Sequence, residues 1–268
     1  MRLIALVAAL MALAVAPAHA ADRGAPPPLR FSVALGDGAR LGAATSLTIR
    51  LAIEPGRPPV DEVRLFTPSG IDLSSSELGM ATCRRPALQI LSVMNLVDRG
   101  PCPGNALMGT GRALAELRFD PEEIFDGAAR LSLYSAESVG DKPGLYVIAD
   151  TTRPVRTQLT YRGYLYVPPP GFGIGMAIQV RPIPQPPFGA PVALSSFRLV
   201  VGSADLRYVR TVHGQPASYH PRAIPLPATC PATGFRFRAV VRLGRDPVHP
   251  DAPPERLTTD AIVPCPQR

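Results

Sequence analysis

The chain has 268 residues, of which 33 are proline, 23 are glycine and none is tryptophan. Because proline interrupts helices wherever it falls, this composition argues against a helical protein, while 46% hydrophobic residues exclude a disordered proline-rich chain. The formal net charge of +7 comes almost entirely from arginine, since Lys142 is the only lysine. A GC-rich genome, which favours arginine codons, explains this charge most simply. Binding to a specific anionic partner is the alternative explanation.

The first 20 residues have the pattern of a secretory signal peptide. An apolar run over residues 3–15 follows Met1 and Arg2, and residues 18–20 (Ala-His-Ala) provide a cleavage site. The run is too short for a membrane anchor, and no later apolar stretch is long enough to span a bilayer. We therefore expect a secreted or periplasmic protein that has no transmembrane anchor and whose mature chain begins at Ala21.

From residue 29 onward the chain is a succession of short apolar or alternating segments that end at proline or glycine, which is typical of β-strands. A proline-rich lead, expected to be flexible, covers residues 21–28. Residues 74–80 could form a short helical turn, and residues 88–91 fit helix or strand equally well. The predicted strands are 29–35, 47–53, 60–66, 112–120, 131–134, 145–149, 158–167, 174–180, 196–201, 206–212 and 235–243.

The polar segment 138–143, which contains Gly140 and Pro143, separates two strand-rich regions. It predicts an N-terminal module over 29–137 and a C-terminal module over 144–268. Many short strands with regular turns indicate an all-β protein, an antiparallel β-sandwich that is immunoglobulin-like in a broad sense. The full immunoglobulin signature is missing, because no tryptophan can pack on a bridge.

The segment 235–243 shows the sharpest alternation in the chain. One face carries Phe235, Phe237, Ala239, Val241 and Leu243, and the other carries Arg236, Arg238, Val240 and Arg242. This pattern predicts a half-buried strand with an apolar face toward the core and a row of arginines on the opposite face.

Four cysteines are consistent with two disulfides in an oxidising compartment, and they allow three pairings. We predict the sequential pairing, Cys83 with Cys102 and Cys230 with Cys265, because each bridge then closes a modest loop within one half of the chain. Neither a C-x-x-C motif nor a histidine at short spacing accompanies them. We therefore predict no metal site and no cofactor.

Two cysteine motifs carry a resemblance to other proteins. Cys102-Pro103 leads to Gly109-Thr110-Gly111 and a strand, and Cys230-Pro231 leads to Gly234-Phe235, a strand and the terminal Cys265. In these features the chain resembles a group of uncharacterised secreted β-sandwich proteins of GC-rich bacteria. That group has no assigned activity, so the resemblance implies a sandwich architecture and an exported location.

The sequence contains few candidate catalytic residues, and we consider one loop as a possible active site. His213, Ser218 and His220 lie close together in the sequence and could supply a nucleophile and a base for a hydrolase. No G-x-S-x-G elbow presents the serine, and the histidine spacing does not match a metal pair. Histidines in an ordinary turn-rich loop explain the pattern better.

The arginine row of Arg236, Arg238 and Arg242 could bind an anionic envelope polymer through bidentate contacts. A solvated strand face, whose charges discourage aggregation, explains it more simply. Nucleic acid is not expected as a partner, because the protein is predicted to be exported and the row lacks interleaved aromatic residues.

With no catalytic constellation in the sequence, we predict a secreted, non-enzymatic, disulfide-bridged protein with a binding or envelope structural role. Its partner is unknown, and an anionic envelope polymer or another protein would fit. A hydrolase at the histidine loop and a polymer binder at the arginine row are the alternatives.

Overall fold

The computed structural model describes residues 27–73, 75–84, 102–120, 123–151, 157–180, 192–245, 251 and 253–266. The predicted signal peptide, most of the proline-rich lead and the ambiguous segment 88–91 lie outside the described residues. Within them the chain is all-β, apart from the single 3-10 turn η1 (Gly104–Ala106). The predicted turn within 74–80 is not helical, because residues 75–77 form an ordinary turn in which Glu77 has a φ of 59°.

The strands lie at the predicted segments, and several, such as β5 and β6, are longer than predicted. Strand β14 has the same bounds as its prediction. Four elements escaped the sequence analysis: the short β2 and β13, β12, and the terminal β15. The strands are β1 (Leu29–Leu35), β2 (Ala44–Thr45), β3 (Leu47–Ile53), β4 (Val60–Pro68), β5 (Leu107–Asp120), β6 (Glu123–Val139), β7 (Lys142–Thr151), β8 (Thr157–Tyr166), β9 (Phe172–Gln179), β10 (Val192–Val201), β11 (Tyr208–Val212), β12 (Gln215–Tyr219), β13 (Ile224–Pro225), β14 (Phe235–Leu243) and β15 (Arg256–Val263).

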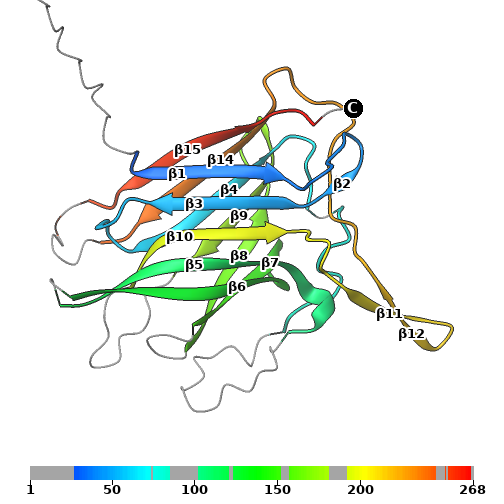
Figure 1. The fold of residues 1–268 in the computed structure, drawn as a ribbon, viewed down its shortest axis with the longest axis horizontal. Helices are drawn as coiled ribbons and strands as arrows, with labels where there is room; N and C mark the ends of the chain where they lie inside the picture. Colours follow the sequence, from blue (N-terminus) through cyan, green and yellow to red (C-terminus); the bar gives the residue numbers. More distant parts are fainter. Residues whose placement is uncertain are drawn as a thin grey trace, which may run out of the picture.

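Eleven of these strands form one antiparallel sheet, in the order β1-β3-β10-β5-β6-β7-β8-β9-β4-β14-β15. The sheet curls until its two edge strands, β1 and β15, lie side by side (Figure 1). Strands β11 and β12 form a separate hairpin that projects away from the body. The curled sheet confirms the predicted antiparallel, sandwich-like all-β class.

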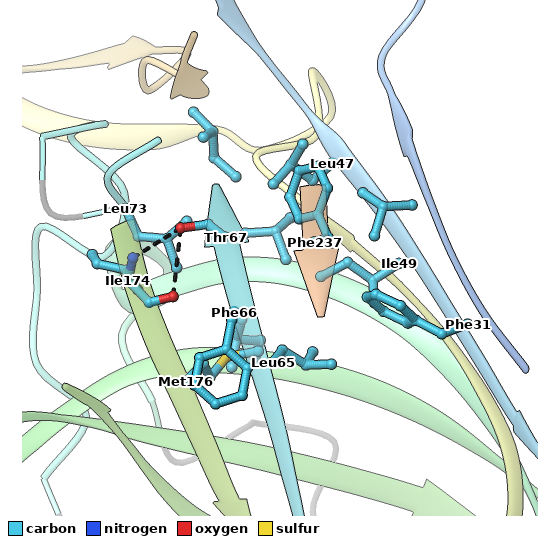
Figure 2. Close-up of a pocket in the computed structure, with 14 residues that line it drawn as sticks. Phe31, Leu47, Ile49, Leu65, Phe66, Thr67, Leu73, Ile174, Met176 and Phe237 are labelled. Atoms are coloured by element: carbon cyan, nitrogen blue, oxygen red, sulfur yellow. Dashed lines mark hydrogen bonds between the residues drawn. The ribbon is translucent and has the colours of Figure 1, made fainter. Parts of the chain in front are cut away.

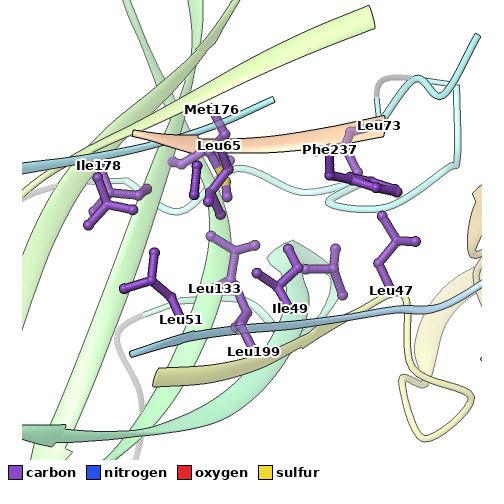
Figure 3. Close-up of a cluster of buried hydrophobic side chains, with 14 of the residues drawn as sticks. Leu47, Ile49, Leu51, Leu65, Leu73, Leu133, Met176, Ile178, Leu199 and Phe237 are labelled. Atoms are coloured by element: carbon purple, nitrogen blue, oxygen red, sulfur yellow. The ribbon is translucent and has the colours of Figure 1, made fainter. Parts of the chain in front are cut away.

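Apolar side chains from opposite walls of the curled sheet meet in its interior. Leu47, Ile49 and Leu51 of β3 and Leu199 of β10 lie opposite Leu65, Met176, Ile178 and Phe237 of β4, β9 and β14 (Figure 3). On β14 the predicted inward face is buried throughout, since its five side chains are at most 3% exposed. Alternation therefore identified the core face of β14 correctly.

The two predicted modules share this single sheet. Strand β10, from the predicted C-terminal module, lies between β3 and β5 of the predicted N-terminal module, and β4 lies between β9 and β14. The predicted junction at 138–143 is the tight β6–β7 hairpin, in which Val139 pairs with Lys142. The structure thus differs from the two-module prediction, because strands far apart in the sequence complete one another's hydrogen bonding.

Both predicted disulfides are present, so the sequential pairing is confirmed. The Cys83–Cys102 bridge packs with Ala106, Ala136 and Tyr146. The Cys230–Cys265 bridge joins the turn before β14 to the end of β15, with 5.9 Å between the two Cα atoms. Each bridge closes a loop on a different part of the same sheet.

Candidate functional site

Buried apolar side chains occupy much of the space inside the curled sheet. A residual cavity of about 30 Å³ is lined by apolar side chains such as Phe31, Ile49 and Met176, together with Thr67 (Figure 2). The Thr67 hydroxyl donates to the Ile71 carbonyl at 3.0 Å and accepts from the Ile174 amide at 2.9 Å, so it is already satisfied. A cavity of this size has room for about one water molecule, so it is no site for an organic ligand.

The histidine loop becomes the β11–β12 hairpin. His213, with a φ of 49°, and Gly214, with a φ of 76°, form its two-residue turn, as expected for a type I′ hairpin. His220 lies at the other end of the hairpin, where its Nδ1 is 3.0 Å from the Leu206 carbonyl oxygen. Five residue pairs lie between His213 and His220, so the two histidines are roughly 20 Å apart at the usual strand rise.

This hairpin does not assemble the hydrolase arrangement that the sequence allowed. Ser218 pairs with Val209 across the two strands, and in the described part of the chain it makes no hydrogen bond to either histidine. Nor do the described residues contain a group of three histidine, cysteine or carboxylate side chains that could hold a metal ion. We conclude that His213, Ser218 and His220 are not positioned as a catalytic set.

The arginine row lies on the outer face of β14, and each of its members is close to a carboxylate. Arg238 donates to both carboxylate oxygens of Asp260 on β15, at 2.6 and 2.9 Å, and Arg236 donates to the same carboxylate at 2.9 Å. The Arg242 Nε is 3.9 Å from a carboxylate oxygen of Asp61. The hydrogen bond from Arg238 holds the pKa of Asp260 below its usual value.

These contacts indicate that the arginine row has a structural role. The Arg236 and Arg238 guanidinium groups also lie 5.3 and 5.2 Å from the centre of the Phe172 ring, which they help to cover. Val240, which shares their face, is only 5% exposed. The row therefore ties β15 and β9 to β14, and two carboxylates offset two of its three positive charges.

Four aromatic rings gather on the same outer face, although they come from three strands. Phe66 of β4 contacts Phe172 of β9 at 5.3 Å between ring centres and Tyr166 of β8 at 6.1 Å. Tyr166 contacts Tyr164, two residues earlier on β8, at 5.8 Å. The Tyr166 ring lies on Gly175, where an added Cβ would come within 2.6 Å of it. The rings thus form a continuous aromatic surface over β8, β9 and β4.

Two cations beside this aromatic surface are not balanced. The Lys142 Nζ lies 4.9 Å from the centre of the Tyr164 ring, and Arg162 precedes Tyr164 by two residues on the outward face of β8. Among the described residues, neither Lys142 nor Arg162 has a carboxylate oxygen within 4 Å, and the Arg162 Nε has no hydrogen-bond partner. We call Lys142, Arg162, Tyr164 and Tyr166 the β7–β8 strip.

The strip combines cations with hydrogen-bonding tyrosines. The Tyr166 hydroxyl is enclosed without a partner among the described residues, and its burial raises the pKa of that hydroxyl. Tyr166 therefore stays protonated at neutral pH and can donate as well as accept a hydrogen bond. Such a surface can bind anions and flat, partly apolar groups, but it offers no nucleophile paired with a base.

The sequence analysis placed Arg162, Tyr164 and Tyr166 on a strand but did not single them out. Their i, i+2 spacing in residues 158–167 was a usable signal, because it puts all three on one face. The contribution of Lys142 and Phe172 could not be read in this way, since it depends on which strands become neighbours.

In comparisons with known proteins, no family model matches the chain, and no curated protein or solved structure is significantly similar to it. Across the part of the chain that the structure describes, no helix has the length and apolarity needed to cross a membrane. The disulfides are compatible with an oxidising compartment.

Proposed function

We propose that this chain is a secreted, non-enzymatic binding protein of the cell envelope and that it binds an envelope polymer on the outer face of its sheet. The observation that carries the proposal is the aromatic and cationic surface over β7, β8, β9 and β4. The small size of the interior cavity supports the outer location of the site, because a volume of about 30 Å³ has no room for an organic ligand.

Binding is favoured over hydrolysis on geometric grounds. The side chains of the surface supply guanidinium, ammonium, phenol and phenyl groups, whereas hydrolysis of a glycosidic or ester bond needs a carboxylate pair or an activated nucleophile. The separation of His213 from His220 along the hairpin removes the support that the sequence gave to a hydrolase.

The test uses the purified, oxidised protein without its first 20 residues. Its binding to isolated peptidoglycan sacculi would be measured by co-sedimentation, and binding to sodium alginate, dextran sulfate and neutral dextran by calorimetric titration. Reducing ends released from each polymer would be assayed in parallel. We expect salt-sensitive binding to at least one anionic polymer and no release of reducing ends. Cleavage of a polymer, or no binding to any of them, would overturn the proposal.

A further inference from the structure

We infer that the ligand of the β7–β8 strip is an acidic polysaccharide, whose carboxylates bind Lys142 and Arg162 while its sugar rings pack on Tyr164 and Tyr166. This inference rests on the proposed function, and it moves the anion site from the arginine row to the opposite side of the aromatic surface. The residues that would specify the ligand are therefore not those that the charge pattern of the sequence suggested.

The first step is the difference in charge balance between the arginine row and the β7–β8 strip. Arg236 and Arg238 share Asp260, so an incoming anion would have to compete with a carboxylate already in bidentate contact. Lys142 and Arg162 face no such competitor among the described residues. A cation without a carboxylate partner gains more binding free energy from a ligand carboxylate than a cation that must first release its own partner. The β7–β8 strip is therefore favoured over the arginine row as the anion site.

The second step is the spacing of the strip. Arg162, Tyr164 and Tyr166 follow one another on the outward face of β8, at roughly 7 Å per pair, and Lys142 reaches Tyr164 from the adjacent strand β7. Along β8 the strip thus presents a cation, then one aromatic ring and then a second ring. A linear polymer in which carboxylates and sugar rings follow one another along the chain complements this arrangement.

The third step is the chemistry of the rings. The face of a tyrosine ring packs against the apolar C–H face of a sugar, while its hydroxyl can donate to or accept from sugar hydroxyls. The unpartnered Tyr166 hydroxyl and Arg162 Nε are groups that a polyhydroxylated ligand could satisfy after a small side-chain movement. A carboxylate polymer without rings would use the two cations only, and this difference can be measured.

The experiment compares two double variants that remove the same amount of charge. Lys142→Gln with Arg162→Gln alters the strip, and Arg236→Gln with Arg242→Gln alters the row. The probe is sodium alginate, titrated calorimetrically at low salt, and thermal unfolding is recorded for each variant. We expect the strip variant to bind alginate about tenfold more weakly or worse, and the row variant to change by less than about threefold.

A third variant, Tyr164→Ser, tests the contribution of the ring. It should weaken binding of alginate but leave binding of poly-γ-glutamate, which has carboxylates and no sugar rings, within about twofold of the unmodified protein. Phosphatidylglycerol vesicles serve as the probe for a lipid surface. Tighter binding to the vesicles than to alginate, removed by the strip variant, would overturn the assignment to a polysaccharide.

The outcomes separate this inference from the proposed function. If the unmodified protein binds none of the polymers, the proposed function fails. If it binds alginate and both double variants lose affinity equally, the binding is general charge attraction and only the assignment to the strip fails. A Tyr164→Ser variant that loses alginate and poly-γ-glutamate alike would show that the ring does not recognise the sugar.

Discussion

Strands β14 and β8 both present basic side chains on the outer face of the same sheet, yet their surroundings differ. The three arginines of β14 lie beside Asp260 and Asp61 on its neighbours β15 and β4, which offset two of their three charges. On β7, Tyr146 lies opposite Arg162 of β8, and Lys142 lies over the Tyr164 ring. Basic residues on a strand thus acquire opposite roles according to the strands that flank them.

The largest expected effect concerns the inner face of β14. Phe237 is 3% exposed and packs in the main core, so Phe237→Ala should lower the free energy of unfolding by about 3–5 kcal/mol. Urea unfolding of the oxidised protein measures this loss. A loss below about 1 kcal/mol would show that β14 does not depend on its core face, and the structural role assigned to its row would lose its basis.

A second prediction addresses the β8 side. Because an added Cβ at Gly175 would collide with the Tyr166 ring, Gly175→Ala should displace this ring and cost about 1–3 kcal/mol of unfolding free energy. Polymer binding should weaken at the same time, since Tyr166 belongs to the strip. Gly104→Ala is the matched control, because a Cβ there would meet no atom within 4 Å. Unchanged stability of Gly175→Ala would contradict the position of the Tyr166 ring.

A third prediction concerns a variant that removes the carboxylate shared by two arginines of the row. Asp260→Asn leaves Arg236 and Arg238 without their carboxylate, which should cost about 0.5–1 kcal/mol of stability at this exposed site. The freed arginines should then raise the affinity for dextran sulfate several-fold, measured by titration at low salt. An unchanged affinity would mean that charge balance is not what separates the two regions.

The pH dependence of the same variant provides its control. A carboxyl whose pKa is lowered by folding contributes stability above its unfolded pKa of about 4, and it loses that contribution as the pH falls through the folded value. The difference in unfolding free energy between the unmodified protein and Asp260→Asn should therefore be constant from about pH 5 to 7 and shrink below about pH 4. A difference that stays constant into acid would exclude Asp260 as its source.

The smallest effect is expected at Arg238. Replacing it by serine removes a solvent-screened ion pair and leaves Arg236 to balance Asp260, so the change in unfolding free energy should stay within about 0.5 kcal/mol. Thermal unfolding at neutral pH would detect anything larger. A loss comparable to that of Phe237→Ala would mean that the outer face of β14 is packed rather than solvated.

Local pattern was enough to locate most strands, and the reason is physical. Side chains alternate between the two faces of a strand, so a strand with one apolar face reveals its bounds and its orientation, as residues 235–243 did. The cysteine pairing could also be predicted, because short loops limit which cysteines can meet. The terminal strand β15 escaped, since Arg256–Val263 buries only Leu257 and Val263 and therefore carries a weak apolar signal.

The strand order and the site were decided only by the tertiary structure. Sequence separation does not fix which strands pair, because a sheet can be completed by any strand whose backbone groups are free, and here β10 inserts between β3 and β5. The charge balance of the arginine row depends on Asp260, which lies 22 residues from Arg238. The aromatic surface likewise combines Phe66 with rings a hundred residues or so away, at 166 and 172. Alternation shows which face a side chain occupies, and only the packing of strands shows what lies beside it.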